Sequence, residues 1–394
     1  MSKCKICIIG GGASGLFAAS LLTESNIDLT IYEKNNKLGK KILASGNGKC
    51  NFSNVGALEG KYNNEFANNI ISKFDVNRTL EEFSNMGLIY KHDNQGRCYP
   101  ISESATSVLD CLKEKLKNVR ILLEKTVDRI VEEGNMIAVF RDGKKELYDY
   151  VICSSGSVAS NLGSDKAYFY LKDYNAKFSD IKASLVPLVV KENVKELSGV
   201  RVKCEMKLVD DKNNVIYTEN GEVLFKDNGI SGIAVFNASS YINRNSSKGY
   251  KIILDISNNL SDSELKKYFS NKTKDNLFKG FLNDKVAEYI YKKTGLKNCG
   301  KLDNSITNKI ICAIRNLEFT VNGLYPVRDA QVCSGGICLS EVNSDLSLKK
   351  NKKIYIAGEL LDIDGVCGGY NLQYAWSSAG VIAESIKDKL NKKE

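Results

Sequence analysis

Two glycine-rich segments near opposite ends of the chain carry residue types that can bind a nucleotide. The first has the sequence Gly-Gly-Gly-Ala-Ser-Gly and begins at Gly10. Gly10 permits a tight turn, Gly12 lets a diphosphate approach the backbone, and Gly15 lets a helix pack closely on a strand. The free N–H groups at the start of that helix would face the diphosphate. The segment therefore predicts a dinucleotide-phosphate site, to which Ala13 and Ser14 also contribute.

The sequence around this motif supplies the elements that the motif needs. Residues 4–9 form a short apolar run typical of a buried strand, and residues 14–25 have apolar side chains at helical spacing. Residues 28–32 indicate a second strand, which ends at Glu33. A carboxylate at this position accepts hydrogen bonds from the adenosine ribose and disfavours a 2′-phosphate. FAD or NAD is therefore expected here rather than NADP.

A second polar, glycine-rich stretch follows the acid and favours FAD. It runs through residues 34–41 and then through residues 44–51. A nicotinamide domain needs no such element at this place, whereas a large flavin with a long ribityl linker does. The cofactor contacts predicted from this stretch are Lys34, Gly39, Lys40, Ser45, Gly46, Lys49, Cys50 and Asn51.

The second glycine-rich segment lies near the C-terminus. We expect Glu359 to accept a hydrogen bond from a ribityl hydroxyl. The later glycine pair should open the last helix, so that its N–H groups face the flavin pyrimidine edge and favour the negative charge that builds there on reduction. One site built from both ends of the chain implies a split domain. The contacts predicted here are Gly358, Glu359, Gly368, Gly369, Tyr370, Asn371 and Leu372.

These motifs together resemble a known family, the BaiN-like flavoproteins, also called the aminoacetone-oxidase type. The family's Glu-Lys pair, Gly-x-Lys and Ser-Gly-x-Gly-Arg-Cys-Asn are similar to residues 33–34, 39–41 and 45–51, with Lys49 in place of the usual Arg. Lysine keeps the charge but loses the planar fork of arginine, so a looser phosphate contact is expected. Further matches lie at residues 96–100, 184–188, 221–225, 229–232 and, most specifically, 357–373.

The resemblance implies an α/β fold: a split Rossmann-like FAD-binding domain of the glutathione-reductase type, with an inserted β-barrel-like part and a small helical part. It also implies contacts from the backbone of Val127 to adenine, and from Ser155 and Gly156 near the flavin. Residues 154–159 and 163–168 depart from the family pattern, and residues 174–175 replace a usual Gly-His. Substrate choice or flavin access is therefore expected to differ from other members.

The distribution of elements predicts the domain organisation. Residues 1–185 and 331–394 should form the two parts of the FAD-binding domain, and residues 259–317 a small helical subdomain. Residues 186–258 and 318–330 alternate in polarity, as in an antiparallel β domain. Helices are predicted at 76–83, 105–116, 261–268, 284–294, 305–317 and 376–390, and strands at 119–131, 136–150, 151–153, 185–190, 200–209, 215–225 and 230–236.

Composition favours a cytoplasmic enzyme without a membrane span. The chain has 394 residues, 43% of them hydrophobic, and no apolar run approaches the roughly 18 residues of a membrane helix. It leads directly into the first expected strand, so no targeting segment is expected. Its 12 cysteines lack a regular framework, which predicts a reducing compartment. The net charge of +9 comes mainly from lysine and indicates a solvated surface; a nucleic-acid groove is the less favoured alternative.

The cysteines and the single histidine have mostly structural interpretations. Cys4 and Cys7 would point to opposite faces of a strand, which disfavours a metal site. Cys333 and Cys338 have the spacing of a redox disulfide but not its usual place in the chain, so we expect none. Cys50 is expected to fill a tight turn, with a reactive thiol as the alternative. One histidine cannot build a histidine metal cage, and no metal is predicted; a solvated loop position is favoured for it over a proton donor.

The predicted function is an FAD-dependent oxidoreductase that acts on a small organic molecule by hydride transfer through the flavin. A second glycine fingerprint is missing, so NAD(P)H would bind only transiently against the flavin. The resembled family includes amine oxidases and reductases of bile-acid transformation, so an amine oxidase that uses oxygen stays an alternative. A tRNA-modifying flavoprotein and a non-catalytic flavin sensor are two others. No catalytic acid or base and no oligomeric state is assigned from the sequence.

Overall fold

The computed structural model describes residues 3–58, 61–163, 168–245, 249–273, 276–295 and 302–392. The chain divides into two compact units: residues 1–182 together with 331–394, and residues 183–330. Part of the region that departs from the family pattern, residues 164–167, lies outside the described residues.

A six-stranded sheet forms the centre of the first unit, with the order β19-β20-β10-β1-β2-β6. All neighbours in it are parallel except β19, which runs antiparallel to β20. The middle strands are apolar and buried, as expected for a parallel sheet covered on both faces. The predicted Rossmann-type fold is therefore confirmed. The strands are β1 (Cys4–Ile9), β2 (Ile27–Tyr32), β6 (Arg120–Leu122), β10 (Tyr150–Cys153), β19 (Ser347–Leu348) and β20 (Asn351–Ile356).

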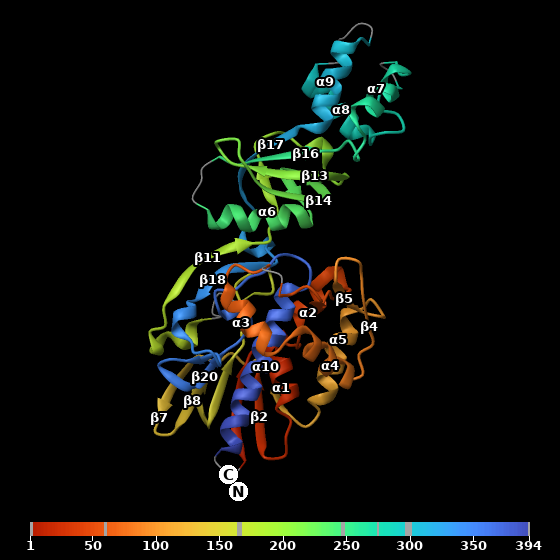
Figure 1. The fold of residues 1–394 in the computed structure, drawn as a ribbon. Helices are drawn as coiled ribbons and strands as arrows, with labels where there is room; N and C mark the ends of the chain where they lie inside the picture. Colours follow the sequence, from red (N-terminus) through yellow and green to blue (C-terminus); the bar gives the residue numbers. More distant parts are fainter. Residues whose placement is uncertain are drawn as a thin grey trace. The chain divides into compact units, whose positions relative to one another are not determined.

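Helices from both ends of the chain pack together beside this sheet. Helix α1 (Ala13–Leu21) contacts the last helix, α10 (Tyr370–Asn391), and Figure 1 shows the two along the sheet. Trp376 of α10 is fully buried, with its ring 5.4 Å from that of Phe17 and 5.2 Å from that of Phe83. The other elements on this side are α2 (Lys40–Ala44), β3 (Ser53–Asn54), α3 (Glu65–Lys73), α4 (Val76–Asn85), β4 (Tyr90–His92), β5 (Arg97–Pro100) and α5 (Ala105–Lys115).

The prediction of one long strand at residues 119–131 and another at residues 136–150 is wrong, because each range is divided into separate strands. Residues 120–122 form β6 of the main sheet, whereas β7 (Arg129–Glu133) belongs to a separate antiparallel sheet with β8 (Met136–Arg141) and β9 (Lys144–Tyr148). The second break falls at Asp142 and Gly143, whose φ angles are +46° and +71°. Asp-Gly with two positive φ angles is the preferred two-residue hairpin turn, and it ends the apolar run.

The second unit contains a closed antiparallel barrel with the order β12-β15-β14-β13-β16-β17, as predicted from the alternating pattern. The strand predicted at residues 230–236 is wrong beyond Ser231, because helix α6 (Ile233–Arg244) begins there. Gly232 has φ +120°, and a Cβ on it would overlap the carbonyl oxygen of Glu222, so the chain turns sharply at this glycine. The barrel strands are β12 (Leu188–Val190), β13 (Arg201–Val209), β14 (Val215–Lys226), β15 (Gly229–Ser231), β16 (Lys251–Asp255) and β17 (Leu317–Leu324).

Three further helices of the second unit lie between β16 and β17 in the chain. Helix α7 begins with a complete capping box, in which Ser261 and Glu264 exchange side chain-to-backbone hydrogen bonds, as the sequence predicts. The helices are α7 (Asp262–Ser270), α8 (Asp284–Thr294) and α9 (Asn304–Arg315). The chain leaves and re-enters the first unit through β11 (Phe178–Ser184) and β18 (Val332–Ile337), which pair with each other.

An ion cluster beside the main sheet predicts acid-sensitive stability. Glu146 accepts hydrogen bonds from Arg120 at 2.6 Å, Tyr148 at 3.1 Å and Arg141 at 3.3 Å. The bond from Arg120 is the largest cause that lowers the pKa of Glu146 to about 2, against the opposing effect of burial. A lowered folded-state pKa stabilises above the unfolded value of 4.5, and this contribution is lost as the pH falls from there toward 2.

Glu146→Gln is therefore expected to lower the free energy of unfolding by about 2 kcal/mol at pH 7 and by much less near pH 2.5. Urea denaturation at both pH values measures the difference. The exposed Glu132 makes a matched control, since Glu132→Gln should change neither value by more than about 0.5 kcal/mol. An equal loss for Glu146→Gln at both pH values would contradict the prediction.

Candidate functional site

The first glycine segment forms the turn between β1 and α1, and its three glycines meet different surroundings. A Cβ on Gly10 would overlap the carbonyl oxygen of Ser154, and Gly10 has φ +110°. A Cβ on Gly15 would overlap the carbonyl oxygen of Gly10 and lie 2.6 Å from Ser154 Oγ. A Cβ on Gly12, by contrast, would have no atom within 4 Å. Gly10 and Gly15 thus serve close packing, whereas Gly12 borders open space at the start of α1, next to Ala13.

Glu33 lies at the end of β2 and holds the glycine loop. It is buried, with 7% of its surface exposed. Its Oε2 accepts the backbone N–H of Gly11 at 2.8 Å, and its Oε1 accepts the backbone N–H and the side-chain amide of Asn35 at 2.7 and 2.6 Å. A carboxylate offers about four acceptor positions, so room for one further donor is left. Gly39 N also donates to Gly11 O at 2.8 Å, which joins the second stretch to this loop.

The lysines of the second stretch have different partners. Lys34 Nζ donates to the carbonyl oxygen of Gly163 at 2.6 Å, and Lys40 Nζ donates to Asn35 Oδ1 at 3.3 Å. The neighbouring Lys41, which the sequence prediction omitted, reaches Glu359 in the C-terminal segment at 2.6 Å. Because α2 begins at Lys40, successive side chains diverge by about 100° around the helix axis. The adjacent lysine in Gly-Lys-Lys was the signal that could have found this contact.

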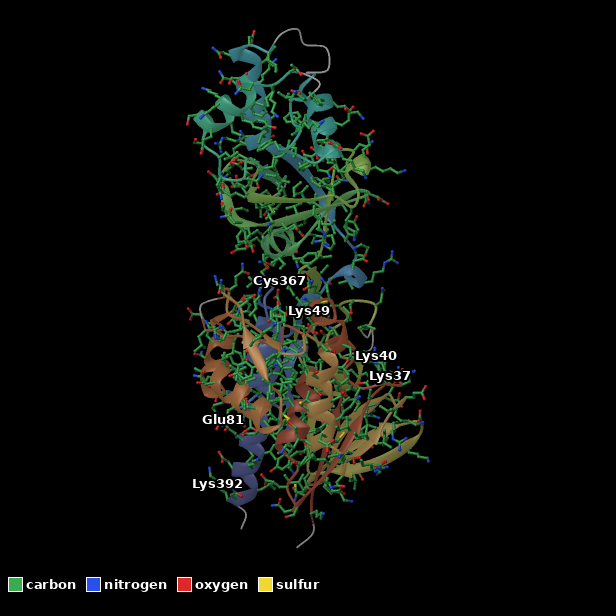
Figure 2. All side chains as sticks on the ribbon, turned by 90° about the vertical axis from the view of Figure 1, so that its right-hand side faces the viewer. Lys37, Lys40, Lys49, Glu81, Cys367 and Lys392 are labelled. Atoms are coloured by element: carbon green, nitrogen blue, oxygen red, sulfur yellow. The ribbon has the colours of Figure 1, made fainter. Side chains whose placement is uncertain are left out.

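Residues 45–51 form a loop with several left-handed residues. Gly46 has φ +56° and Cys50 has φ +55°. The Cys50 thiol is fully buried, and burial raises its pKa to about 11 although a hydrogen bond with Ser45 lowers it, so the thiol stays protonated at neutral pH. This favours the tight-turn interpretation over a reactive thiol. Lys49, labelled in Figure 2, is 55% exposed and pairs with Glu103 at 2.7 Å.

Asn51 closes this loop with an unsatisfied acceptor. Its Oδ1 is buried and accepts no hydrogen bond from the part of the chain that the structure describes. A Cβ on Gly369 would lie 2.8 Å from this oxygen, so Asn51 faces the residue that precedes α10. Buried acceptors are rarely left without a donor, and a bound ligand is one way to supply it.

The C-terminal segment meets the N-terminal loops at Gly358 and Glu359. Gly358 has φ +62°, and a Cβ on it would lie 2.9 Å from Ser14 Oγ at the start of α1. Glu359 Oε2 accepts Ser157 Oγ at 3.2 Å as well as Lys41 Nζ. A Cβ on Gly156 would lie 3.8 Å from the same oxygen. The neighbouring Ser155 hydroxyl is hydrogen-bonded to Tyr170 OH at 2.7 Å.

Helix α10 begins at Tyr370, directly after the glycine pair, as predicted from the glycines, whereas the helix start predicted at residue 376 is six residues too late. Gly368 and Gly369 have φ +128° and +96°, and a Cβ on Gly369 would overlap the carbonyl oxygen of Ser53. Asn371 shapes the preceding loop, since its amide exchanges two hydrogen bonds of 2.9 Å with the backbone of Gly365. Tyr370 is 8% exposed, and the partly buried Leu372 packs against the core of the first unit.

A buried polar network ties the N-terminal loop to α10. Gln373 is fully buried; its Oε1 accepts Ser53 Oγ at 2.6 Å, and its Nε2 donates to Thr79 Oγ1 at 2.8 Å and to Ser377 Oγ at 2.9 Å. Trp376 Nε1 donates to the carbonyl oxygen of Phe52 at 2.8 Å. Both ends of the chain are therefore fixed at one place, as the split-domain prediction requires.

The remaining predicted positions contribute little to the candidate site. Val127 is 5% exposed and lies in the connection between β6 and β7. His92 is exposed on β4, and Cys333 and Cys338 are free cysteines. Within the described ranges no three His, Cys, Asp or Glu side chains group as metal ligands would, and no helix is long and apolar enough to cross a bilayer.

Comparison with known proteins assigns this chain to a family. Residues 4–385 match the family described as HI0933-like protein Rossmann domain. The chain belongs to the HI0933-like family. One relative is the 3-dehydro-bile acid delta(4,6)-reductase of Clostridium scindens, 32% identical over 98% of this chain and 99% of that protein. The resemblance to BaiN-like flavoproteins is thereby confirmed, and the protein is an FAD-dependent oxidoreductase.

Two further proteins are similar to this chain. The ribosomal RNA dihydrouridine synthase of Escherichia coli is 24% identical over 98% of each chain. The fold is similar to that of the 3-ketosteroid-delta4-(5alpha)-dehydrogenase from Rhodococcus jostii RHA1, with a TM-score of 0.50, 10% identity and 97% of each chain covered.

The residues present fit FAD. Open space beside Gly12 at the start of α1 suits a diphosphate, and the buried acceptor of Asn51 beside the start of α10 lacks a donor that a ligand can supply.

Proposed function

We propose that this protein uses FAD to reduce a carbon–carbon double bond conjugated to a carbonyl group in a small organic substrate. NAD(P)H serves as the transient electron donor. The full-length similarity to a delta(4,6)-reductase that acts on a 3-dehydro-bile acid carries the proposal. By its name, that reaction saturates double bonds conjugated to a ketone. A polycyclic, largely apolar enone is therefore the substrate class proposed here.

The chain's own residues would bind the cofactor from both ends. The N–H groups at the start of α1 and the space beside Gly12 would hold the diphosphate, and the spare acceptor capacity of Glu33 would take a ribose hydroxyl. Glu359 would accept a ribityl hydroxyl, and the start of α10 after Gly369 would favour negative charge at the pyrimidine edge. When bound, FAD would supply the hydride-transfer chemistry between the donor and the substrate.

The test follows the flavin absorbance under anaerobic conditions. Purified, FAD-loaded protein should be bleached by NADH or NADPH and recover its colour on addition of a 3-oxo-Δ4,6-steroid. The saturated 3-oxo-steroid is the control and should not restore the colour. Bleaching by an amine but by neither nicotinamide would contradict the proposal and favour an amine oxidase. Many product equivalents per flavin would exclude a sensor without turnover.

A second candidate substrate is ribosomal RNA, which the similarity to a ribosomal RNA dihydrouridine synthase favours. The chemistry is related, because dihydrouridine arises by saturation of the uracil double bond next to a carbonyl. RNA retention at low salt that falls steeply as salt rises, together with dihydrouridine formed in unmodified ribosomal RNA, would support it. Absence of both would leave the small enone as the substrate.

A further inference from the structure

We propose that Lys41 cancels the charge of Glu359 and thereby raises the reduction potential of the bound flavin. The inference rests on the proposed FAD site. It starts from the ion pair of 2.6 Å between Lys41 Nζ and Glu359 Oε2, whose side chains are 32% and 21% exposed. These residues are 318 positions apart, so the pair joins the two ends of the chain inside the candidate site.

Glu359 binds two side chains of the protein through only one of its carboxylate oxygens. Lys41 Nζ and Ser157 Oγ both bind its Oε2, at 2.6 and 3.2 Å. Oε1 is thereby left to accept a ribityl hydroxyl, the role proposed above. Lys41 is the cation that pairs with Glu359 within the described ranges. The carboxylate can therefore bind the cofactor while its charge is neutralised from the other side.

The position of the ammonium group is set by the start of α2. Gly39 precedes the helix with φ +65°, and a Cβ on it would lie 2.5 Å from Leu109 of α5, so this turn is closely packed. Ile42 buries the other face of the helix, being 1% exposed. A short helix held in this way directs Lys41 to Glu359 and Lys40 to Asn35. A charge fixed in advance contributes more than one that must reorganise.

The sign of the effect follows from elementary electrostatics. Two electrons from the nicotinamide donor make the flavin more negative. An unpaired carboxylate nearby opposes this added charge and lowers the potential, whereas an unpaired ammonium favours it. Removing Lys41 alone should therefore make the flavin harder to reduce, removing the charge of Glu359 alone should make it easier, and removing both should restore the wild-type value.

The experiment is a spectroelectrochemical titration of FAD-loaded protein. We expect Lys41→Met to lower, and Glu359→Gln to raise, the ratio of reduced to oxidised flavin at a fixed potential about tenfold, a shift of about 30 mV for a two-electron couple. Lys41→Met combined with Glu359→Gln should return close to wild type, and Lys41→Arg should match it. The control is Lys37→Met: Lys37 is exposed, labelled in Figure 2, and should leave the potential unchanged.

The outcomes separate this inference from the proposed function. Wild-type protein that takes up no FAD would contradict the proposed function itself. Variants that bind FAD but share the wild-type potential would overturn only the role of Lys41. If Lys41→Met does not bind FAD, the test rests on Glu359→Gln alone. A flavin reduction potential in Glu359→Gln at or below that of the wild type would then overturn the inference. Equal losses of FAD binding in both single variants would indicate that the ion pair has a purely structural role, and would count against the inference.

Discussion

Replacing Gly12 by alanine is expected to weaken FAD binding about a hundredfold while leaving the apoprotein almost as stable as wild type. Gly12 has φ −89° and ψ −165°, which alanine adopts without strain, and a Cβ would meet no atom within 4 Å. The free energy of unfolding should therefore change by less than about 1 kcal/mol. The new methyl group would occupy the space proposed for the diphosphate, where a hundredfold loss corresponds to about 2.7 kcal/mol.

Gly15→Ala is the matched variant in the same turn, and we expect it to lower the stability of the apoprotein. Its Cβ would overlap the carbonyl oxygen of Gly10 and lie 2.6 Å from Ser154 Oγ, so helix α1 must move away from the sheet. We expect a loss of about 3 kcal/mol in the free energy of unfolding of the apoprotein. Urea denaturation without cofactor and fluorescence titration with FAD distinguish the two variants. Wild-type affinity in Gly12→Ala would place the diphosphate elsewhere; wild-type stability in Gly15→Ala would contradict the packing argument.

The sequence predicted the site best where backbone geometry dictates residue type. The turn between β1 and α1 needs glycine at Gly10 and Gly15 because side chains there would overlap the backbone, so the spacing itself is informative. The start of α10 after Gly369 was predictable for the same reason, since a positive φ beside a close neighbour admits only glycine. Local alternation also indicated the barrel of the second unit, and motif order indicated the family.

Side-chain direction and element boundaries were less predictable, because they depend on contacts between distant residues. Lys40 and Lys41 are equivalent in sequence, and only the start of α2 decides which one reaches Glu359. Residues 233–236 are as apolar as a strand, but Gly232 redirects the chain so that they start a helix. The buried partners of Gln373 on β3 and α4 are about 300 residues away in the chain. The hydrophobic periodicity of the sequence does not indicate such distant contacts.

Gln373→Ala is expected to lower the free energy of unfolding by about 3 kcal/mol. The side chain is fully buried and makes hydrogen bonds with Ser53, Thr79 and Ser377. The substitution removes three buried hydrogen bonds, although Thr79 Oγ1 keeps its bond to the carbonyl oxygen of Asp75, and it opens a cavity; both effects destabilise. Chemical denaturation measures the loss. The control is Gln95→Ala at an exposed position, where a change within about 0.5 kcal/mol is expected.

Gln373→Met separates the two contributions, because methionine nearly restores the volume but forms no comparable hydrogen bonds. We expect it to recover only about 1 kcal/mol of the loss, since the buried hydroxyls of Ser53 and Thr79 still lack the hydrogen bonds that they make with Gln373 in the wild type. These two residues lie on β3 and α4, so both variants should also loosen residues 45–51 against α10. FAD affinity of the folded variants should then fall together with stability. Wild-type stability in Gln373→Met would show that packing alone joins the two ends of the chain.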